Sequence, residues 1–273
     1  RHHFVHPSLR QELTNKVEAQ CATGILNAPD PAFNPLSDKH LVRTYDAAGH
    51  PSGKRDNKRH LQQMLGLIQD DEAPLFFWPS RLDPIQKGCK LLADIFYHVI
   101  SRWWHQNLQV VFVADGPYQQ VFRDIVDQHG FHQRVTVCDF SEQLEHLGYA
   151  AADFILMPSL FEPCGLPQMI APIYGALPVA HDTGGIHDTI AHLDAAAKTG
   201  NGFLFEVYDS GGLFWAIEEA MRFYNLPVDE RRRHVTRVMT SAVQTFNYTA
   251  TARHYIDLYE KMLARPLIVQ PPV

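Results

Sequence analysis

The chain has 273 residues, 45% of them hydrophobic and 20% charged, a composition that can bury the core of one large domain or two small ones. Its 24 lysines and arginines against 30 aspartates and glutamates give a net charge of −6, which argues against a nucleic-acid-binding or membrane-surface protein. No apolar run reaches the ~18 residues that a membrane span needs. A few local cations and backbone amides must therefore hold any anionic ligand.

The first quarter of the chain contains no strand-like run. Its hydrophobic periodicity predicts a helix over residues 9–22, and the Pro/Asn/Asp-rich residues 27–46 predict a loop. Residues 51–56 are polar and turn-like, and a helix is expected over residues 57–65.

From residue 75 onward, short apolar runs alternate with helical periodicity. The strand-like runs are 75–79, 108–114, 134–138, 153–157, 177–180 and 202–205. The helical stretches are 86–101, 118–128, 142–151, 166–174, a further helix opened by Gly184 and Gly185, and finally 213–223, 229–245 and 249–264. Hydrophobicity within the strands is continuous, which is typical of strands covered on both faces. The sequence therefore predicts an α/β fold with a doubly wound parallel sheet.

Ligands in such folds bind at the carboxyl ends of the strands, so the loops after the strands carry the candidate residues. The first of these loops, SRLDPIQKG (residues 80–88), contains Arg81 and Lys87. The planar guanidinium and the compact ammonium together suit a pyrophosphate. A solvated surface loop with two ordinary cations is the alternative interpretation.

Two further strand ends carry weaker signals. Gly116 permits a tight turn before a helix whose first turn could face a phosphate, but an ordinary strand–turn–helix connection is the better default. Phe140 follows the third strand, where an aromatic ring can stack on a purine, but the sequence by itself favours a ring that caps the core.

The loop after the fourth strand, PSLFEPCGLPQ (residues 158–168), combines an acid with a glycine turn. The backbone amides around Gly165 and Leu166 predict an anion site before the next helix. Beside it, the Glu162 carboxylate can accept hydrogen bonds from sugar hydroxyls. This loop is therefore predicted to be the floor of a nucleotide-sugar site.

The loop after the fifth strand, HDTGGIHDT (residues 181–189), allows a second close backbone approach at Gly184 and Gly185. Three strand ends thus carry residues suited to ligand binding. Their coincidence on one edge of the sheet favours a binding site over three unrelated surface loops.

The motifs SRLDPIQKG, FEPCGL and TGGIHDT resemble the C-terminal domain of bacterial glycogen synthases and plant starch synthases, glycosyltransferases of the GT-B fold. The segments GILNAPDPAFNP, KRDNKRHLQQMLGL, YAAADFILMPS and ARHYIDLYEKML extend the resemblance over residues 24–264. This range is expected to be the Rossmann-like nucleotide-sugar-binding domain. Residues 1–23 are expected to be a linker or the tail of an N-terminal domain, and residues 265–273 a C-terminal tail.

The resemblance implies a hexosyltransferase that moves glucose from ADP-glucose, or UDP-glucose, to the non-reducing end of an α-1,4-glucan with retention. It implies catalytic roles for Arg81 and Lys87, which bind the donor phosphates and stabilise the departing diphosphate. Glu162 is expected to contact the transferred glucose. Neither a metal nor pyridoxal phosphate nor another cofactor is expected.

The resemblance also implies a larger donor-binding set. These residues are Phe140, Cys164, Gly165, Leu166, Pro167, Thr183, Gly184 and Gly185. Phe140 stands where the family often places Tyr against adenine, and Asn27 and Asp30 are expected to face the cleft. Pro167 replaces a residue that is commonly Thr and removes a backbone donor, and the loop between Arg81 and Lys87 is one residue longer than usual.

A GT-B enzyme has a second, N-terminal α/β domain that carries a K-x-G-G loop and a catalytic-site His, and neither pattern occurs here. We therefore expect the isolated chain to bind donor nucleotide without catalysing transfer. Its expected partners are a nucleotide sugar, an α-1,4-glucan acceptor and the missing N-terminal domain, with no nucleic acid and no membrane.

Three alternative functions compete with this interpretation. Sucrose- or trehalose-type synthases usually carry a second Glu eight residues after the first, where this chain has Ile170. A glucan phosphorylase would need a Lys for pyridoxal phosphate in a G-x-G-N-M-K-like setting, which is absent. A non-catalytic nucleotide- or glucan-binding module stays open, and nucleotide titration would discriminate it.

The four cysteines, Cys21, Cys89, Cys138 and Cys164, show neither C-x-x-C spacing nor a small disulfide framework. Such thiols fit a reducing compartment. A cytoplasmic location, as in a bacterium, is expected in preference to the plastid stroma.

Overall fold

The computed structural model describes residues 6–267, which fall into two units. The smaller unit comes from the two ends of the chain, Arg1–Asn27 and Thr249–Val273. It contains α1 (Pro7–Glu18) and nearly all of α10 (Tyr248–Leu263), and neither helix buries a residue. Within this unit the Thr251 hydroxyl donates to the Leu26 carbonyl at 3.2 Å.

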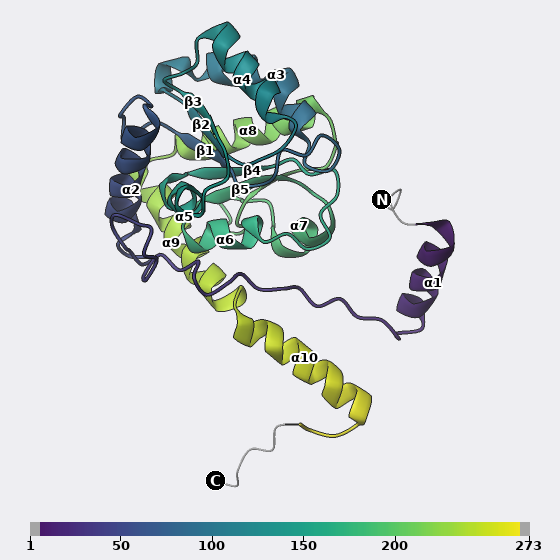
Figure 1. Cartoon of the computed structure of the whole chain (residues 1–273). Helices are drawn as coiled ribbons and strands as arrows, with labels where there is room; N and C mark the ends of the chain where they lie inside the picture. Colours follow the sequence, from purple (N-terminus) through teal and green to yellow (C-terminus); the bar gives the residue numbers. More distant parts are fainter. Residues whose placement is uncertain (1–5, 268–273) are drawn as a thin grey trace. The chain divides into compact units, whose positions relative to one another are not determined.

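The larger unit, Ala28–Tyr248, is built on a six-stranded parallel sheet (Figure 1). The strands are β1 (Leu75–Trp78), β2 (Gln109–Val113), β3 (Val135–Cys138), β4 (Phe154–Met157), β5 (Leu177–His181) and β6 (Phe203–Phe205). Their spatial order is β3-β2-β1-β4-β5-β6. The chain builds outward from β1 to β3, returns to place β4 beside β1, and then builds in the other direction. The predicted doubly wound fold is confirmed, and its topological switch point lies between β1 and β4.

Helices cover both faces of this sheet (Figure 1). One layer contains α3 (Cys89–Arg102), α4 (Gln119–His129) and α8 (Ser210–Tyr224), with α3 packed against the other two. The other layer contains α2 (His50–Leu65), α5 (Glu142–Ala151), α6 (Pro167–Ile173) and α9 (Val228–Thr245), paired as α2 with α5 and α6 with α9. Two short helices, η1 (Trp104–Gln106) and α7 (Gly184–Thr189), complete the unit. No helix in residues 6–267 has both the length and the apolar character to cross a membrane.

The predicted turn over residues 51–56 is wrong, because α2 already begins at His50. Pro51 stands in the first helical turn, where its missing N–H breaks no helical hydrogen bond. Gly53 packs beneath Tyr45, and a Cβ at this glycine would lie 2.4 Å from the Tyr45 ring. The proline and the glycine therefore serve a helix start and a close packing contact. The other predicted strands and helices are present, with shifted ends.

Fully buried aromatic rings fill the space between the sheet and the layer of α3 and α4. Phe112 and Phe122 stack with ring centroids 4.5 Å apart, and Trp78 lies 5.8 Å from Phe112. Burial of each such ring stabilises the fold by roughly 2–3 kcal/mol. The Trp78 indole N–H donates to the Ser80 carbonyl at 2.7 Å, so the core also anchors the start of the loop after β1.

Candidate functional site

The loops after β1, β4 and β5 meet at the carboxyl edge of the sheet because these strands are neighbours. The loop after β1 docks on the loop after β4 through backbone contacts. Leu160 donates its N–H to the Gln86 carbonyl at 2.8 Å, and the Gln86 side chain donates to the Phe161 carbonyl at 3.4 Å. Gly88 has φ +70°, and a Cβ there would lie 1.9 Å from the Pro158 carbonyl oxygen. Only glycine allows this approach.

Asp83 shapes the turn between Arg81 and Lys87. Its Oδ1 accepts the N–H groups of Ile85 at 2.9 Å and Gln86 at 2.6 Å. The Gln86 N–H in particular holds the pKa of the Asp83 carboxyl below its usual value, with smaller help from Ile85 and the two cations. Asp83 is therefore a structural residue of the loop that presents the two cations.

Lys87 and Glu162 form a buried ion pair between the loops after β1 and β4. The Lys87 ammonium lies 2.5 Å from Glu162 Oε2, and the two side chains are only 12% and 8% exposed. The Ser159 hydroxyl donates to the same oxygen at 3.3 Å. Because both charges are out of water, removal of either would leave its partner buried and unpaired.

His181, the last residue of β5, contacts the backbone of Ser159, whose hydroxyl donates to Glu162. Its Nδ1 lies 2.7 Å from the Ser159 carbonyl oxygen, an atom that can only accept, so Nδ1 carries the proton. A polar chain thus runs from His181 through Ser159 and Glu162 to Lys87. Neither Ser159 nor His181 was predicted as a site residue, although Ser159 stands inside the PSLFEPCGLPQ motif.

Gly184 and Gly185 press the loop after β5 against the Glu162 backbone. The Gly185 N–H donates to the Glu162 carbonyl at 2.8 Å. A Cβ at Gly184, where φ is +49°, would lie 2.1 Å from that carbonyl oxygen, and one at Gly185 would lie 2.0 Å from the Cys164 carbonyl oxygen. Thr183 precedes them, half-buried, at the N-cap of α7. Both glycines are therefore required for the packing of the two loops.

The turn from Cys164 to Pro167 is held by Gln168. This fully buried side chain donates to the Cys164 carbonyl at 2.7 Å and to the Gly165 carbonyl at 3.1 Å. In the described structure the Gly165 and Leu166 amides donate to no protein acceptor, and Pro167 begins α6 without an N–H. Two neighbouring backbone donors are thus left for a ligand. The sequence did not predict the role of Gln168, because its hydrogen bonds to the Cys164 and Gly165 carbonyls form only in the folded turn.

Arg81 and Phe140 are exposed at the same edge. The Arg81 guanidinium forms no hydrogen bond or ion pair with another residue of the range 6–267. Phe140 is 56% exposed, and its N–H donates to the Asp115 carboxylate at 3.0 Å. The core-capping interpretation of Phe140 is therefore wrong, and its ring is available to stack on a ligand.

The two residues expected to face the cleft differ in their surroundings. Asp30 is exposed, and its carboxylate accepts the Ala32 N–H at 2.8 Å in a local turn. Asn27 is also exposed and is the last residue of the first segment of the smaller unit. Their role at a cleft stays a prediction.

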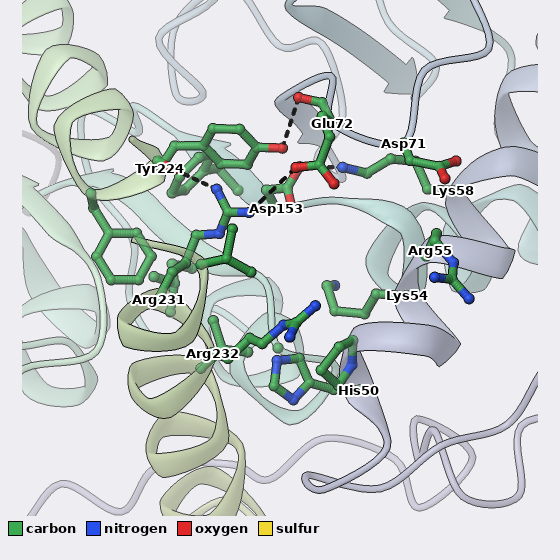
Figure 2. A pocket seen from close by; sticks show the side chains of 17 residues that line it. His50, Lys54, Arg55, Lys58, Asp71, Glu72, Asp153, Tyr224, Arg231 and Arg232 are labelled. Carbon is green, nitrogen blue, oxygen red and sulfur yellow. Dashed lines mark hydrogen bonds and ion pairs between the residues drawn. The ribbon is translucent and has the colours of Figure 1, made fainter. Parts of the chain in front are cut away.

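A cavity of about 140 Å³ lies at the opposite, amino edge of the sheet (Figure 2). Lys54 of α2 reaches into its wall and donates to three backbone carbonyls. These carbonyls end α5 and α6: Ala150 at 3.1 Å, Ala152 at 2.7 Å and Tyr174 at 3.1 Å. A cation is favourable at helix C-termini. Burial nevertheless lowers the pKa of Lys54 to about 7, while Asp153 opposes this shift.

The other cations of this cavity are also largely engaged. The Lys58 ammonium lies 2.7 Å from the Asp153 carboxylate, and the Arg231 guanidinium lies over the Tyr224 ring at 4.2 Å (Figure 2). These contacts join α2 to the start of β4 and α9 to the end of α8. The amino edge is therefore organised by internal contacts, whereas the carboxyl edge leaves donors open.

Comparisons with known proteins place these features in a family. Residues 73–222 match the family model described as "Glycosyl transferases group 1". A glycogen synthase from Anoxybacillus flavithermus is 35% identical over 243 residues, which are 88% of this chain and 48% of that protein. A glycogen synthase from Thermotoga petrophila is 37% identical over 246 residues, 89% of this chain and 48% of that protein. The chain spans about half the length of the curated relatives that it matches.

Solved structures agree with the fold. The catalytic domain of starch synthase IV from Arabidopsis thaliana, bound to ADP and acarbose, superposes with a TM-score of 0.78 at 32% identity. The match covers 93% of this chain and 51% of that one. A sucrose-phosphate synthase from Thermosynechococcus elongatus gives a TM-score of 0.60 at 22% identity and supports the fold alone. The unit Ala28–Tyr248 has the Rossmann-like architecture of a GT-B glycosyltransferase domain.

Proposed function

Because this chain belongs to the glycosyl transferases group 1, we propose that it is the donor-binding domain of a retaining glucosyltransferase of the glycogen and starch synthase type. In this proposal the whole enzyme transfers glucose from ADP-glucose, or UDP-glucose, to the non-reducing end of an α-1,4-glucan. The observation that carries it is the buried Lys87–Glu162 pair beside open backbone amides, at the carboxyl edge of the sheet. The similarity to a starch synthase bound to ADP supports ADP as the diphosphate.

The proposed chemistry follows from charge. During transfer, the bond between C1 of glucose and the diphosphate oxygen breaks, and its electron pair leaves with the diphosphate. A hydroxyl oxygen at the non-reducing end of the glucan forms the new bond to C1, and its proton passes to the departing diphosphate. Arg81 and Lys87 stabilise this growing negative charge, and the Gly165 and Leu166 amides bind the distal phosphate. Glu162 accepts a hydrogen bond from a glucose hydroxyl, while its contact with the Lys87 ammonium at 2.5 Å holds the carboxylate in place. Phe140 stacks on the base.

The remaining donor-side residues position these groups. Gly184 and Gly185 hold the backbone of Glu162, Thr183 precedes them at the N-cap of α7, and Cys164 and Pro167 frame the two amides. We propose that this arrangement needs no metal and no other cofactor, because cations and amides already provide the charge stabilisation. Treatment of the whole enzyme with a chelator is therefore expected to leave transfer unchanged.

Transfer is proposed to require a second α/β domain that completes the cleft and holds the glucan. The chain spans about half of its relatives, and α1 exposes the apolar side chains of Leu9, Leu13 and Val17 along one face. Robust glucan extension from radiolabelled ADP-glucose by this chain alone would contradict the requirement. A cytoplasmic location is part of the same proposal, because the four free cysteines fit a reducing compartment.

The direct test of the donor role is calorimetric titration of the chain with ADP and with UDP. One saturable site is expected, with ADP binding more tightly. If neither nucleotide binds at millimolar concentration, the donor-site proposal fails and a structural or protein-interaction role is favoured.

A further inference from the structure

Two histidines and a glutamate converge between the loop that precedes α2 and the first turns of α5. His40 lies in that loop, and Glu142 and His146 stand four residues apart on one face of α5. One nitrogen or carboxylate oxygen from each residue lies within 4.8 Å of the other two. None of the three belongs to the proposed donor site.

His146 is held as a metal-ligating histidine usually is. Its Nδ1 lies 2.7 Å from the Asp38 carboxylate, which also accepts the Tyr174 hydroxyl at 2.5 Å. The Phe33 ring stacks on the imidazole with centroids 4.3 Å apart. A carboxylate on Nδ1 fixes the tautomer and leaves the lone pair of Nε2 for a metal. Both Asp38 and His146 are buried, so this orientation is rigid.

His40 brings the second imidazole. Its Nε2 is buried and has no hydrogen-bond partner among residues 6–267, which is costly for a polar atom. The nearest carboxylate oxygen, Oε1 of Glu142, lies 3.6 Å away, beyond hydrogen-bond distance. The His40 ring centroid is 4.8 Å from that of His146. A ligand shared by these groups would explain the unpaired nitrogen.

We propose that His40, His146 and Glu142 bind one divalent transition-metal ion of the zinc type, with water in the fourth position. Two imidazoles and a carboxylate suit Zn²⁺ rather than Mg²⁺ or Ca²⁺, which prefer oxygen ligands. Zinc with ligands at about 2.0–2.1 Å places them roughly 3.3 Å apart in a tetrahedron. His40 Nε2 and Glu142 Oε1 are 3.6 Å apart, which is close to this spacing, and the Glu142 side chain is 68% exposed and free to adjust. The ion ties the loop around His40 to α5.

The test is zinc titration of the full chain after removal of metal with a chelator. We expect one ion per chain and a rise in Tm of about 5 °C at a hundredfold excess over Kd. Cobalt at the same site is expected to give the visible absorption of a four- or five-coordinate ion. The His40→Ala substitution should weaken zinc binding at least 100-fold and abolish the cobalt spectrum.

Two further variants keep the test independent of folding defects. Glu142→Gln, at an exposed position, should weaken binding about tenfold, and Tyr174→Phe, which removes one donor to Asp38, should weaken it about 10-fold or more. His132→Ala is the matched control, because His132 lies 3.7 Å from Asp127 in an exposed pair and should not affect the site. Zinc binding that His40→Ala leaves unchanged overturns the proposal. So does the lack of a saturable zinc site in the chelator-treated wild-type chain.

Discussion

The two edges of the sheet both bury a lysine, but they satisfy it differently. At the carboxyl edge, Lys87 pairs with the carboxylate of Glu162, and open amides and the exposed Arg81 lie beside the pair. At the amino edge, the Lys54 ammonium is satisfied by three backbone carbonyls that end two helices. Lys54 is bound by backbone carbonyls and therefore joins helices. Lys87 is paired with a carboxylate next to unpaired backbone donors, an arrangement that is suited to binding a ligand.

The largest expected effect is on stability at the amino edge. Lys54→Ala removes all three hydrogen bonds and leaves a cavity between α2, α5 and α6, so we expect a loss of about 3–4 kcal/mol in the free energy of unfolding. Urea unfolding measures this loss. Arg55→Ala, on the same helix but exposed, is the control and should change stability by less than about 0.5 kcal/mol. Equal losses in the free energy of unfolding for the two substitutions would show that the Lys54 hydrogen bonds do not stabilise the packing of these helices.

The next effect concerns the packing of loops at the carboxyl edge. Gly184→Ala places a Cβ against the Glu162 carbonyl in a backbone region that alanine disfavours, and should cost about 2–3 kcal/mol of stability. It should also weaken ADP binding. Gly66→Ala provides the control, because Gly66 has φ +67° with open space around its Cβ position and should cost only about 1 kcal/mol. Similar losses of stability in both variants would contradict the close approach of Gly184 to the Glu162 carbonyl.

The amino edge should also respond to pH. Lys54 keeps its proton up to pH 10.5 when unfolded, but only to about 7 when folded. Between these values the unfolded state binds more protons, so stability rises with pH, by at most about 1.4 kcal/mol per pH unit. Urea midpoints of wild type and Lys54→Met from about pH 7 to about pH 9 measure the difference. Parallel profiles would show that Lys54 does not titrate in this range.

The smallest effect is expected at the exposed aromatic ring of the carboxyl edge. Phe140→Ala should weaken ADP binding about fivefold to tenfold through loss of stacking, with little change in stability. Tyr97→Ala, which removes a similarly exposed ring from α3, should leave ADP affinity unchanged. Calorimetric titration of both variants measures the contrast. An unchanged affinity in Phe140→Ala would remove the ring from the donor site.

The sequence predicted the sheet and the meeting of three loops because continuous apolar runs and glycine motifs are local signals. It could not predict that α2 begins at His50, since the packing of Gly53 on Tyr45 is a tertiary contact. The carbonyl partners of Lys54 come from positions some 100 residues away in the sequence, and no local sequence pattern near Lys54 predicts these contacts. Ser159 and His181 likewise acquire their roles only when β4 and β5 lie side by side.

The comparison of the two lysines is tested most directly by the ADP affinity of Lys87→Ala and Lys54→Met, measured by calorimetry on folded protein. We expect Lys87→Ala to weaken ADP binding at least tenfold, whereas Lys54→Met and the surface control Lys90→Ala should retain wild-type affinity. Lys90 is suitable because it stands three residues from Lys87 in an exposed pair with Asp94. Wild-type ADP affinity in Lys87→Ala, or an equal loss in Lys54→Met, would contradict the assignment of the carboxyl edge as the donor site.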